Sequence, residues 1–500
     1  MQLKQIIQKL HVATVVGPTG QEINGISYDV RAVQPGSLYV AMARETVDGH
    51  DSIDEAIGRG AVAIICERNG TIKQRATKIE VPHSAEALAL VASSFYEEPA
   101  RKLKMIGVAG SFGQCSVAYT LRHLLQQSGI KTGLVGSIHH QVGEREFPVQ
   151  RISSESLDVQ KLLRQMVNAG CGVCVVEINE QSLRNNRFFG IDFEMIISTR
   201  IERNFSFSAD QELLEETLRQ LVRNARHACV INVDDPVGYQ LSQAHGAARL
   251  ISYGIEERAQ IAASGIQLFA SGSRFELQIG NEIHSCGIPH VGRRSILSAV
   301  GAVAGALTAG VPFDRIESKL ADLPGIPGHL EAVSCGQSFS VFVDHANNEE
   351  EFASVLQTLR EVCRRRLIVA FGCEGERHEE KRYTMGRIAA NAADYTIITA
   401  DNSRNEPVRD IIAEIEQGYL AIRQNHYEIC VDRAAAITQA IALARPGDCV
   451  LIAGKGHNTY QEFEDAISPF DDREYASEAL AIKCALTPQS ETSGAALANV

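Results

Sequence analysis

The chain has 500 residues, a formal net charge of −13 and a hydrophobic fraction of 45%. This length exceeds what one compact core accommodates, so several domains are expected. The acidic balance disfavours binding to nucleic acid or to an anionic membrane surface. The sequence has no run of about 18 apolar residues and no secretory h-region at its start, so no membrane span is expected.

The 12 cysteines are scattered, and most stand within apolar runs. Such thiols are typical of buried side chains in a reducing compartment, which predicts a cytoplasmic protein. Cys171 and Cys174 form one C-x-x-C, but no second pair and no nearby histidine pair accompanies them. Buried strand cysteines are therefore favoured over a zinc or redox role.

In chain order, short apolar runs first alternate with amphipathic segments, which predicts a small α/β unit. A strand–helix series follows, typical of a mostly parallel sheet with helices on both faces. After a Pro/Gly-rich linker at 324–329, a second such series predicts a doubly wound, Rossmann-like domain. The sequence thus predicts an α/β protein with three domains, at 1–98, 99–330 and 331–486, and a loose tail at 487–500.

A predicted strand leads into Gly110-Ser111-Phe112-Gly113-Gln114-Cys115-Ser116 and then into a helix near 115–129. Glycines and a helix N-terminus in this order can cradle a phosphate, so the central domain is P-loop-like. A working loop also needs a lysine for the phosphates and a hydroxyl for Mg²⁺. Gln114 and Cys115 hold those positions, and Ser116 could supply a hydroxyl only after a register shift. A β-turn-α connection without a ligand remains an equal alternative.

Polar residues gather after predicted strand ends in the last domain, at Asp344, 374–377, 401–404 and 455–457. Because the carboxyl ends of parallel strands meet at one edge of a sheet, these residues predict a ligand crevice.

Several motifs occur in a specific order along the chain. They are Asp29-Val30-Arg31 and Asp48-Gly49-His50 near the start, Glu177, Arg187 and INVDDP in the centre, and FGCEGER, DNSR, AGKGH and PFDDRE towards the end. Each motif alone is weak, but the ordered set is specific. Over nearly all of residues 1–480 the chain resembles the Mur ligase family, in the branch that adds the third residue to UDP-N-acetylmuramoyl-L-Ala-D-Glu.

The resemblance implies a chemistry for peptidoglycan precursor synthesis. ATP phosphorylates the D-Glu carboxylate, and an incoming amine attacks the acyl phosphate while Mg²⁺ and lysine hold the charge. The implied cofactors are ATP and Mg²⁺, and the implied partners are a UDP-muramoyl dipeptide and a diaminopimelate-like amino acid. Arg404 and Arg377 are implied to bind that amino acid, because a guanidinium can hold a carboxylate bidentately.

The resemblance also implies a set of site residues. Glu177 and Arg187 would be catalytic, with Glu177 also the metal ligand. The remaining implied residues are Gly110, Gly113, Gln114, Cys115, Ser116, Arg293 and Asp344 for ATP; Arg377, Asp401, Asn402, Arg404, Gly454 and Asn458 for the amino acid; and Asp29, Arg31 and His50 for the UDP-substrate.

Each of these assignments has a structural alternative. Glu177 could be a strand-end carboxylate in a local ion pair, and Arg187 and Arg293 could be surface arginines. Asp344 could cap the following helix, and His457 could be a satisfied loop histidine.

The chain also departs from the family pattern. Gln114 replaces the loop lysine, and the predicted helix near 211–225 contains no lysine that could be carbamylated. Further departures stand at Val30, 152–154, 179–181, 204–207, His329, Asn347 and Asn458. Losing the lysine and most of the metal shell should cost more than ~5 kcal/mol, which is over a thousandfold in rate.

Three hypotheses follow. The chain is a diverged ATP-dependent ligase, a non-catalytic homologue that binds an amino acid, a nucleotide sugar or a protein partner, or a ligase for a different acid and amine. Because the lysine and metal ligands that phosphoryl transfer needs are missing, the hypothesis of a non-catalytic homologue is favoured.

Overall fold

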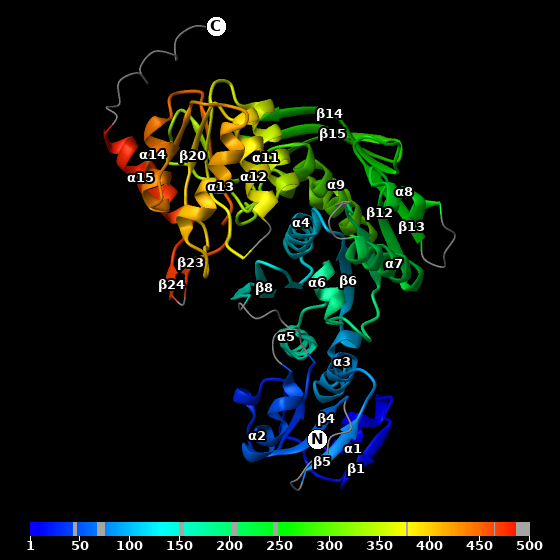
Figure 1. Cartoon of the computed structure of the whole chain (residues 1–500). Helices are drawn as coiled ribbons and strands as arrows, with labels where there is room; N and C mark the ends of the chain where they lie inside the picture. The colour runs from blue at the N-terminus through cyan, green and yellow to red at the C-terminus, as the bar shows by residue number, and fades with distance from the viewer. Residues whose placement is uncertain are drawn as a thin grey trace. The chain divides into compact units, whose positions relative to one another are not determined.

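The structure is a computed structural model that describes residues 1–43, 48–67, 76–149, 155–201, 208–243, 249–376, 379–464 and 466–486. The chain divides into two compact units. Figure 1 labels their helices and strands. The first unit comprises Met1–Ser264, Leu277–His284 and Leu297–Leu320, and the second comprises Gly265–Glu276, Ser285–Ile296 and Ala321–Val500. The predicted α/β class is confirmed, whereas the three domain boundaries stay a prediction.

The first unit begins with a five-stranded sheet in the order β1-β5-β4-β3-β2. Its strands are β1 (Thr14–Val16), β2 (Gly25–Ser27), β3 (Ser37–Val40), β4 (Ala61–Cys66) and β5 (Thr77–Glu80). All neighbours are parallel except β1 and β5. The accompanying helices are α1 (Leu3–Ile6), α2 (Ile53–Gly58) and α3 (Ser84–Phe95), with 3₁₀ turns η1 (Ile7–Lys9), η2 (Val30–Ala32), η3 (Gly49–Ser52) and η4 (Pro99–Lys102).

A larger sheet follows, whose strands run in the order β13-β12-β11-β6-β10-β7-β8-β9 within this unit. They are β6 (Lys104–Ala109), β7 (Thr132–Val135), β8 (His139–Val142), β9 (Arg145–Pro148), β10 (Val173–Ile178), β11 (Met195–Ser198), β12 (Ala228–Asn232) and β13 (Arg249–Gly254). The strands from β13 to β7 are parallel, and β8 and β9 add an antiparallel edge. The predicted mostly parallel sheet is therefore confirmed.

The helices of this middle region are α4 (Gln114–Gln127), α5 (Ser156–Asn168), α6 (Glu180–Arg184), α7 (Ser208–Asn224) and α8 (Pro236–Ser242). Strands β14 (Ile261–Phe269), β15 (Gly272–Ile279) and β16 (Glu282–Ile288) come next, followed by α9 (Arg293–Thr308) and α10 (Phe313–Leu320). The helices predicted near 115–129 and 211–225 correspond to α4 and α7.

The second unit contains a six-stranded sheet in the order β17-β18-β22-β19-β20-β21. Its strands are β17 (Glu331–Ala332), β18 (Ser340–Asp344), β19 (Leu367–Phe371), β20 (Tyr395–Ile398), β21 (Tyr427–Ile429) and β22 (Cys449–Ala453). All neighbours are parallel except β17 and β18. Strands β23 (Tyr460–Phe463) and β24 (Ala466–Pro469) form a separate hairpin.

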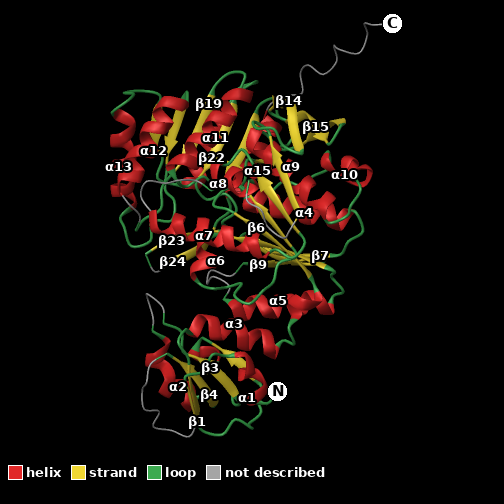
Figure 2. Cartoon of the chain, turned by 90° about the vertical axis from the view of Figure 1, so that its right-hand side faces the viewer, coloured by secondary structure: helices red, strands yellow, loops and turns green. Residues whose placement is uncertain are grey.

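Helices cover both faces of this sheet, as Figure 2 shows. Side chains alternate across β18, so Phe342 joins one apolar layer, while Val341 and Val343 join the other. The first layer packs α11 (Glu349–Val362), α12 (Glu379–Ala392) and α13 (Val408–Leu420), and the second packs α14 (Arg433–Leu443) and α15 (Asp472–Leu486). The doubly wound prediction is therefore confirmed.

A buried ion pair joins α14 to α15. Arg433 donates from Nε to Asp472 Oδ1 and from Nη2 to Asp472 Oδ2, both at 2.7 Å, and both side chains are 0% exposed. Arg433 also donates to the carbonyl of Ala453, which ends β22, and to that of Ala400, two residues after the end of β20. One guanidinium thus ties two helices to the carboxyl edge of the sheet.

In the described part of the chain, no helix combines the length and apolarity that crossing a membrane requires.

Replacing Asp472 by alanine should destabilise the second unit by about 3–5 kcal/mol, because Arg433 would remain charged, buried and unpaired. Thermal unfolding followed by calorimetry would measure the loss. Glu478→Ala is the matched control, since Glu478 is an exposed acidic residue on the same helix. Equal effects of the two substitutions would contradict the assigned role of the pair.

Candidate functional site

The glycine loop lies where the sequence predicts it, between β6 and α4. Gly113 has a φ of +81° and caps α4 without a side-chain hydrogen bond. A Cβ on Gly110 would lie 2.0 Å from Thr199 Oγ1 and 2.9 Å from the Arg200 carbonyl oxygen. Both positions therefore need glycine, one for its backbone conformation and the other for close approach.

Some backbone N–H groups of the glycine loop donate to a carbonyl of the chain itself. The N–H groups of Ser111 and Phe112 both donate to the Arg200 carbonyl, at 3.0 and 3.1 Å. A phosphate cradle needs such groups to converge on the anion. In this structure the α4 N-terminus remains the anion-favouring part of the loop.

Cys115 and Glu177 form a buried cluster at the end of β10. The exposed fraction is 7% for Cys115 and 4% for Glu177. Ser137 Oγ donates to Glu177 Oε2 at 2.7 Å, whereas Glu177 Oε1 has no hydrogen-bond partner within the described residues. The sequence did not point to Ser137, because a serine after a strand carries no distinctive signal.

Burial decides the protonation of this cluster. It raises the pKa of Glu177 to about 7, against hydrogen bonds from Ser137 and Cys115 that lower it. Burial, and then the charge of Glu177, raises the pKa of the Cys115 thiol well above its ordinary value. The cluster is therefore a neutral thiol beside a carboxyl group that is about half protonated near neutral pH.

These residues do not fit Mg²⁺. The ion requires oxygen ligands in an octahedral arrangement, and a protonated thiol occupies the position that should supply a hydroxyl. Gln114 brings no charge, and its buried Oε1 finds no donor in the described part of the chain. Across the described ranges, no group of three or more His, Cys, Asp or Glu side chains could hold a metal ion.

Arg187 has unused hydrogen-bonding capacity. Its Nε and Nη2 atoms are buried and have no hydrogen-bond partner within the described residues. Burial lowers the pKa of Arg187, and the nearby Glu155 and Tyr28 raise it. Because a buried guanidinium needs acceptors, this side chain is suited to an anionic ligand such as a carboxylate.

The residues predicted to bind the UDP-substrate form a local scaffold. Asp29 accepts from the Arg31 backbone at 2.9 Å and from the Arg31 guanidinium at 2.7 Å. His50 Nδ1 lies 2.6 Å from Asp48, and His50 Nε2 accepts from the Glu67 N–H at 3.0 Å. The accepting Nε2 places the proton on Nδ1. Asp29 and His50 therefore stabilise the loops in which they lie, and a role in substrate binding stays a prediction.

In the second unit, Asp401 and Asn402 surround Lys455. The Lys455 side chain is 0% exposed, and its Nζ donates to Asn402 Oδ1 at 2.8 Å and to Asp401 Oδ1 at 3.4 Å. Gly454 has a φ of +114°, and a Cβ there would lie 2.7 Å from Asp401 Oδ2. Lys455 is thus engaged inside its own unit.

Arg404 lies closer to the surface, with 25% of its side chain exposed. Its Nη atoms contact Glu374 Oε2 and the Gly375 carbonyl, each at 3.3 Å, and its Nε lies 3.9 Å from Glu462. These contacts are long for charge-assisted hydrogen bonds. The guanidinium is therefore oriented by neighbours that a ligand carboxylate could displace.

Asp344 ends β18 beside three histidines. It accepts from the N–H groups of Leu330 at 2.6 Å and Ala346 at 2.8 Å, and burial raises its pKa to about 7. The His457 ring lies 4.6 Å from that of His345 and 6.4 Å from that of His329. The sequence did not indicate this grouping, because the three residues come from separate loops.

The other predicted residues are placed as follows. The Asn458 N–H donates to the Lys455 carbonyl at 2.9 Å, Ser116 lies in the first turn of α4, and Arg293 begins α9. Arg377, the second arginine implied to bind the amino acid, lies outside the described residues. The departures from the family pattern at 152–154 and 204–207 and the predicted tail at 487–500 lie outside them as well.

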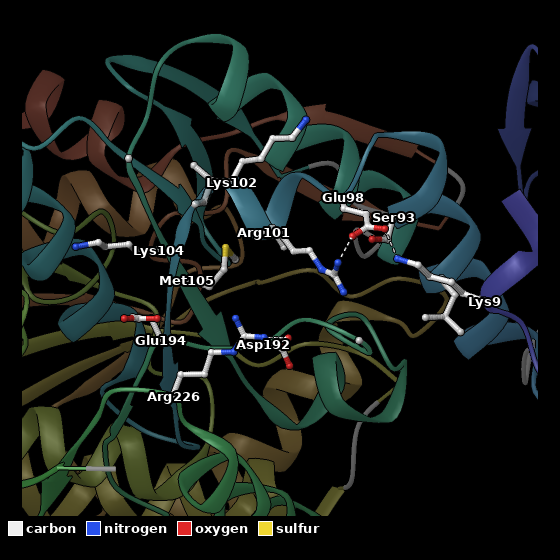
Figure 3. A pocket seen from close by; sticks show the side chains of 15 residues that line it. Lys9, Ser93, Glu98, Arg101, Lys102, Lys104, Met105, Asp192, Glu194 and Arg226 are labelled. Carbon is white, nitrogen blue, oxygen red and sulfur yellow. Dashed lines mark hydrogen bonds and ion pairs between the residues drawn. The ribbon is translucent and has the colours of Figure 1, made fainter. Parts of the chain in front are cut away.

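A cavity of about 550 Å³ lies elsewhere in the first unit (Figure 3). Lys104 and Met105, which line it, begin β6, whereas the glycine loop follows the end of that strand. Arg101 contacts Glu98 at 2.8 Å, and Arg226 is paired with Asp192. The cavity is therefore at the opposite edge of the sheet from the loop, and its charges partly neutralise one another.

Models of known protein families match most of the chain. The model for the catalytic domain of the Mur ligase family matches residues 22–96, the Mur ligase middle domain matches 108–306, and the glutamate ligase domain of Mur ligases matches 329–456. UDP-N-acetylmuramoyl-L-alanyl-D-glutamate–2,6-diaminopimelate ligase of Syntrophomonas wolfei is 35% identical over 485 residues, which are 96% of this chain and 99% of that protein. The protein of the same name from Caldanaerobacter subterraneus is 34% identical over 470 residues, covering 93% and 96%.

Solved structures share the fold. A UDP-N-acetylmuramoyl-L-alanyl-D-glutamate–2,6-diaminopimelate ligase aligns with a TM-score of 0.69 at 21% identity, over 97% of this chain and 99% of that one. The MurF ligase of Thermotoga maritima, solved in complex with ADP, aligns with a TM-score of 0.61 at 18% identity, over 92% and 96%.

The raised pKa of Glu177 predicts a pH-dependent stability. Because the folded state holds the proton more tightly than the unfolded state, stability falls as pH rises from about 4.5 to about 7. Glu177→Gln removes this loss, so the variant should gain up to about 2–3 kcal/mol over the wild type at pH 8 and little at pH 4.5. Chemical denaturation at both pH values would measure the gain, and a difference independent of pH would contradict the assignment.

Proposed function

The chain belongs to the Mur ligase family, and we propose that it binds the acid and amino-acid substrates of that family without turning over ATP at the family's rate. Relatives that are 32–35% identical over most of the chain are named for UDP-N-acetylmuramoyl-L-alanyl-D-glutamate and 2,6-diaminopimelate. Those two compounds are therefore the proposed ligands. The proposed location is the cytoplasm, where nucleotide-linked precursors occur.

The thiol of Cys115 beside the buried carboxyl of Glu177 is the observation that carries this proposal. Phosphoryl transfer depends on fixed cations that neutralise charge on the transferred group. Here a neutral amide, a neutral thiol and a partly protonated carboxyl occupy the positions at which the family resemblance implies a lysine and metal ligands. No reaction step through Mg²⁺ can be assigned to these side chains.

Two arginines support retained binding. Arg187 in the first unit has buried N–H groups that find no acceptor among the described residues, and Arg404 in the second unit is held by long contacts. Each can receive a carboxylate, and the proposed ligands both carry carboxylates. Binding would take place with the chain's own residues and would not require ATP.

An active ligase is the second candidate, and the extent of the similarity favours it. Relatives aligned over 96% of this chain carry a ligase name, and the related MurF ligase of Thermotoga maritima was solved with ADP. Activity would require another cation in place of the loop lysine. Lys455 is already paired with Asp401 and Asn402, which argues against its taking that role.

ADP release with UDP-N-acetylmuramoyl-L-Ala-D-Glu, meso-diaminopimelate and Mg-ATP tests the proposal. The wild type should be slower than a family enzyme with the loop lysine by more than about a thousandfold. Gln114→Lys combined with Cys115→Thr should raise turnover, because it restores a cation and a hydroxyl, and Gln114→Leu with Cys115→Thr serves as its uncharged control. Robust turnover by the wild type would refute the proposal.

Calorimetry with meso-diaminopimelate tests the binding site separately. Arg404→Ala should weaken binding by about 10–150-fold, because a charge-assisted contact contributes about 1.5–3 kcal/mol. Arg409→Ala is the matched control, since Arg409 is an exposed arginine on α13. If the wild type binds the amino acid and Arg404→Ala binds it equally well, the assignment of Arg404 is wrong.

A further inference from the structure

Two cysteines far apart in sequence meet on the second unit. Cys335 lies in the turn between β17 and β18, and Cys484 lies in the last turn of α15. Their Sγ atoms are 2.7 Å apart although the residues are separated by 149 positions. Cys335 is exposed and Cys484 is partly exposed, so a small reagent can reach the pair.

Other contacts hold each thiol in place. In the turn, the Cys335 N–H donates to Gln337 Oε1 at 2.7 Å, and Gln337 Nε2 donates to the Val333 carbonyl at 3.0 Å. On α15, Lys483 Nζ donates to the Ile441 carbonyl at 2.7 Å and lies 4.8 Å from the centre of the Phe339 ring. The sulfur atoms are therefore brought together by the fold and do not depend on each other for position.

We propose that Cys335 and Cys484 are a redox modification site, at which a low-molecular-weight disulfide oxidises the two thiols to an intramolecular disulfide. The thiolate of Cys484 attacks one sulfur of the reagent, and the reagent's S–S bond breaks to release its first thiol. The sulfur of Cys335, after losing its proton, attacks Cys484 in the mixed disulfide and releases the second thiol. The protein loses two hydrogen atoms, and the reagent gains them.

The order of attack follows from the contact between the thiols. Cys335 donates to the Cys484 sulfur, and this hydrogen bond raises the pKa of Cys335. Because Cys335 is the donor in this contact and keeps its proton, the Cys484 sulfur attacks first and Cys335 resolves the mixed disulfide.

A second cysteine pair in the same unit provides an internal comparison. A hydrogen bond involving Cys449 lowers the pKa of Cys363 to about 7, and Cys363 is partly exposed, so we expect its thiol to react with the reagent as well. Cys449, however, is only 2% exposed and lies in β22, within the sheet. A reagent can reach Cys363 while its neighbour stays enclosed, so this pair should take up the reagent without forming a cross-link.

Closing the disulfide would join the β17–β18 turn to the end of α15. Cross-linking residues this far apart restricts the unfolded chain, so the oxidised second unit should unfold at a higher temperature than the reduced one. The modification would also leave the sheet unchanged, because neither cysteine belongs to a strand.

Treatment of the full chain with oxidised glutathione, followed by alkylation and peptide mapping, tests the site. The wild type should yield a peptide pair joined through Cys335 and Cys484, lose the two thiols of that pair in addition to the thiol of Cys363, and unfold at a higher temperature. Cys335→Ser should instead retain glutathione on Cys484 and show no rise in unfolding temperature. Cys363→Ser is the control and should still form the cross-link.

Three outcomes would overturn the proposal. They are glutathione retained separately on both cysteines of the wild type, disulfides that join two chains, and modification confined to Cys363 or to Cys430, another partly exposed cysteine of the second unit. Mass spectrometry under non-reducing conditions distinguishes them. A folded Cys335→Ser variant with an unchanged circular dichroism spectrum would show that the lost cross-link does not reflect unfolding.

Discussion

A carboxylate that is buried at the edge of a sheet must be neutralised by a cation or by a proton, and this chain uses both solutions. Burial raises the pKa of Asp344 in the second unit, as it does that of Glu177 in the first, whereas two other carboxylates of the second unit are paired with cations. In the second unit, Asp472 is paired with Arg433, and Asp401 with Lys455. In the first unit, Glu177 has Ser137 and Cys115 beside it, and burial raises its pKa to about 7. The first unit therefore holds a proton where a phosphate-transferring enzyme needs fixed positive charge.

The buried charge pairs of the second unit lie within the motifs that the sequence carries there. Asp401, Asn402 and Lys455 belong to DNSR and AGKGH, and Asp472 belongs to PFDDRE. All four are buried. The hydrogen bond from Lys455 to Asn402 joins two loops that follow strands, and that from Arg433 to Asp472 joins two helices. Losing one partner would leave a charge uncompensated in the interior. The motifs are thus required for the fold of the unit as well as for any ligand that it binds.

The glycine loop shows the opposite situation. Its backbone geometry is retained at Gly110 and Gly113, because neighbouring atoms leave no room or the φ angle is positive. Its side chains at Gln114 and Cys115 carry no charge that could balance a triphosphate. Steric constraints on the backbone persist in a folded domain whether or not the loop binds a nucleotide, whereas electrostatic requirements apply only when it does.

The sequence by itself determined the order of strands and helices and the α/β class, because hydrophobic periodicity and glycine or proline breaks are local properties. It also identified Gln114 and Cys115 as departures, since a motif position can be read without coordinates. Only the tertiary structure decided that the Arg200 carbonyl accepts from backbone N–H groups of the glycine loop and that Lys455 is paired with Asn402. It alone also decided that Cys335 contacts Cys484. Those contacts join segments that are far apart in the chain, and they depend on sheet order and packing, which no local pattern specifies.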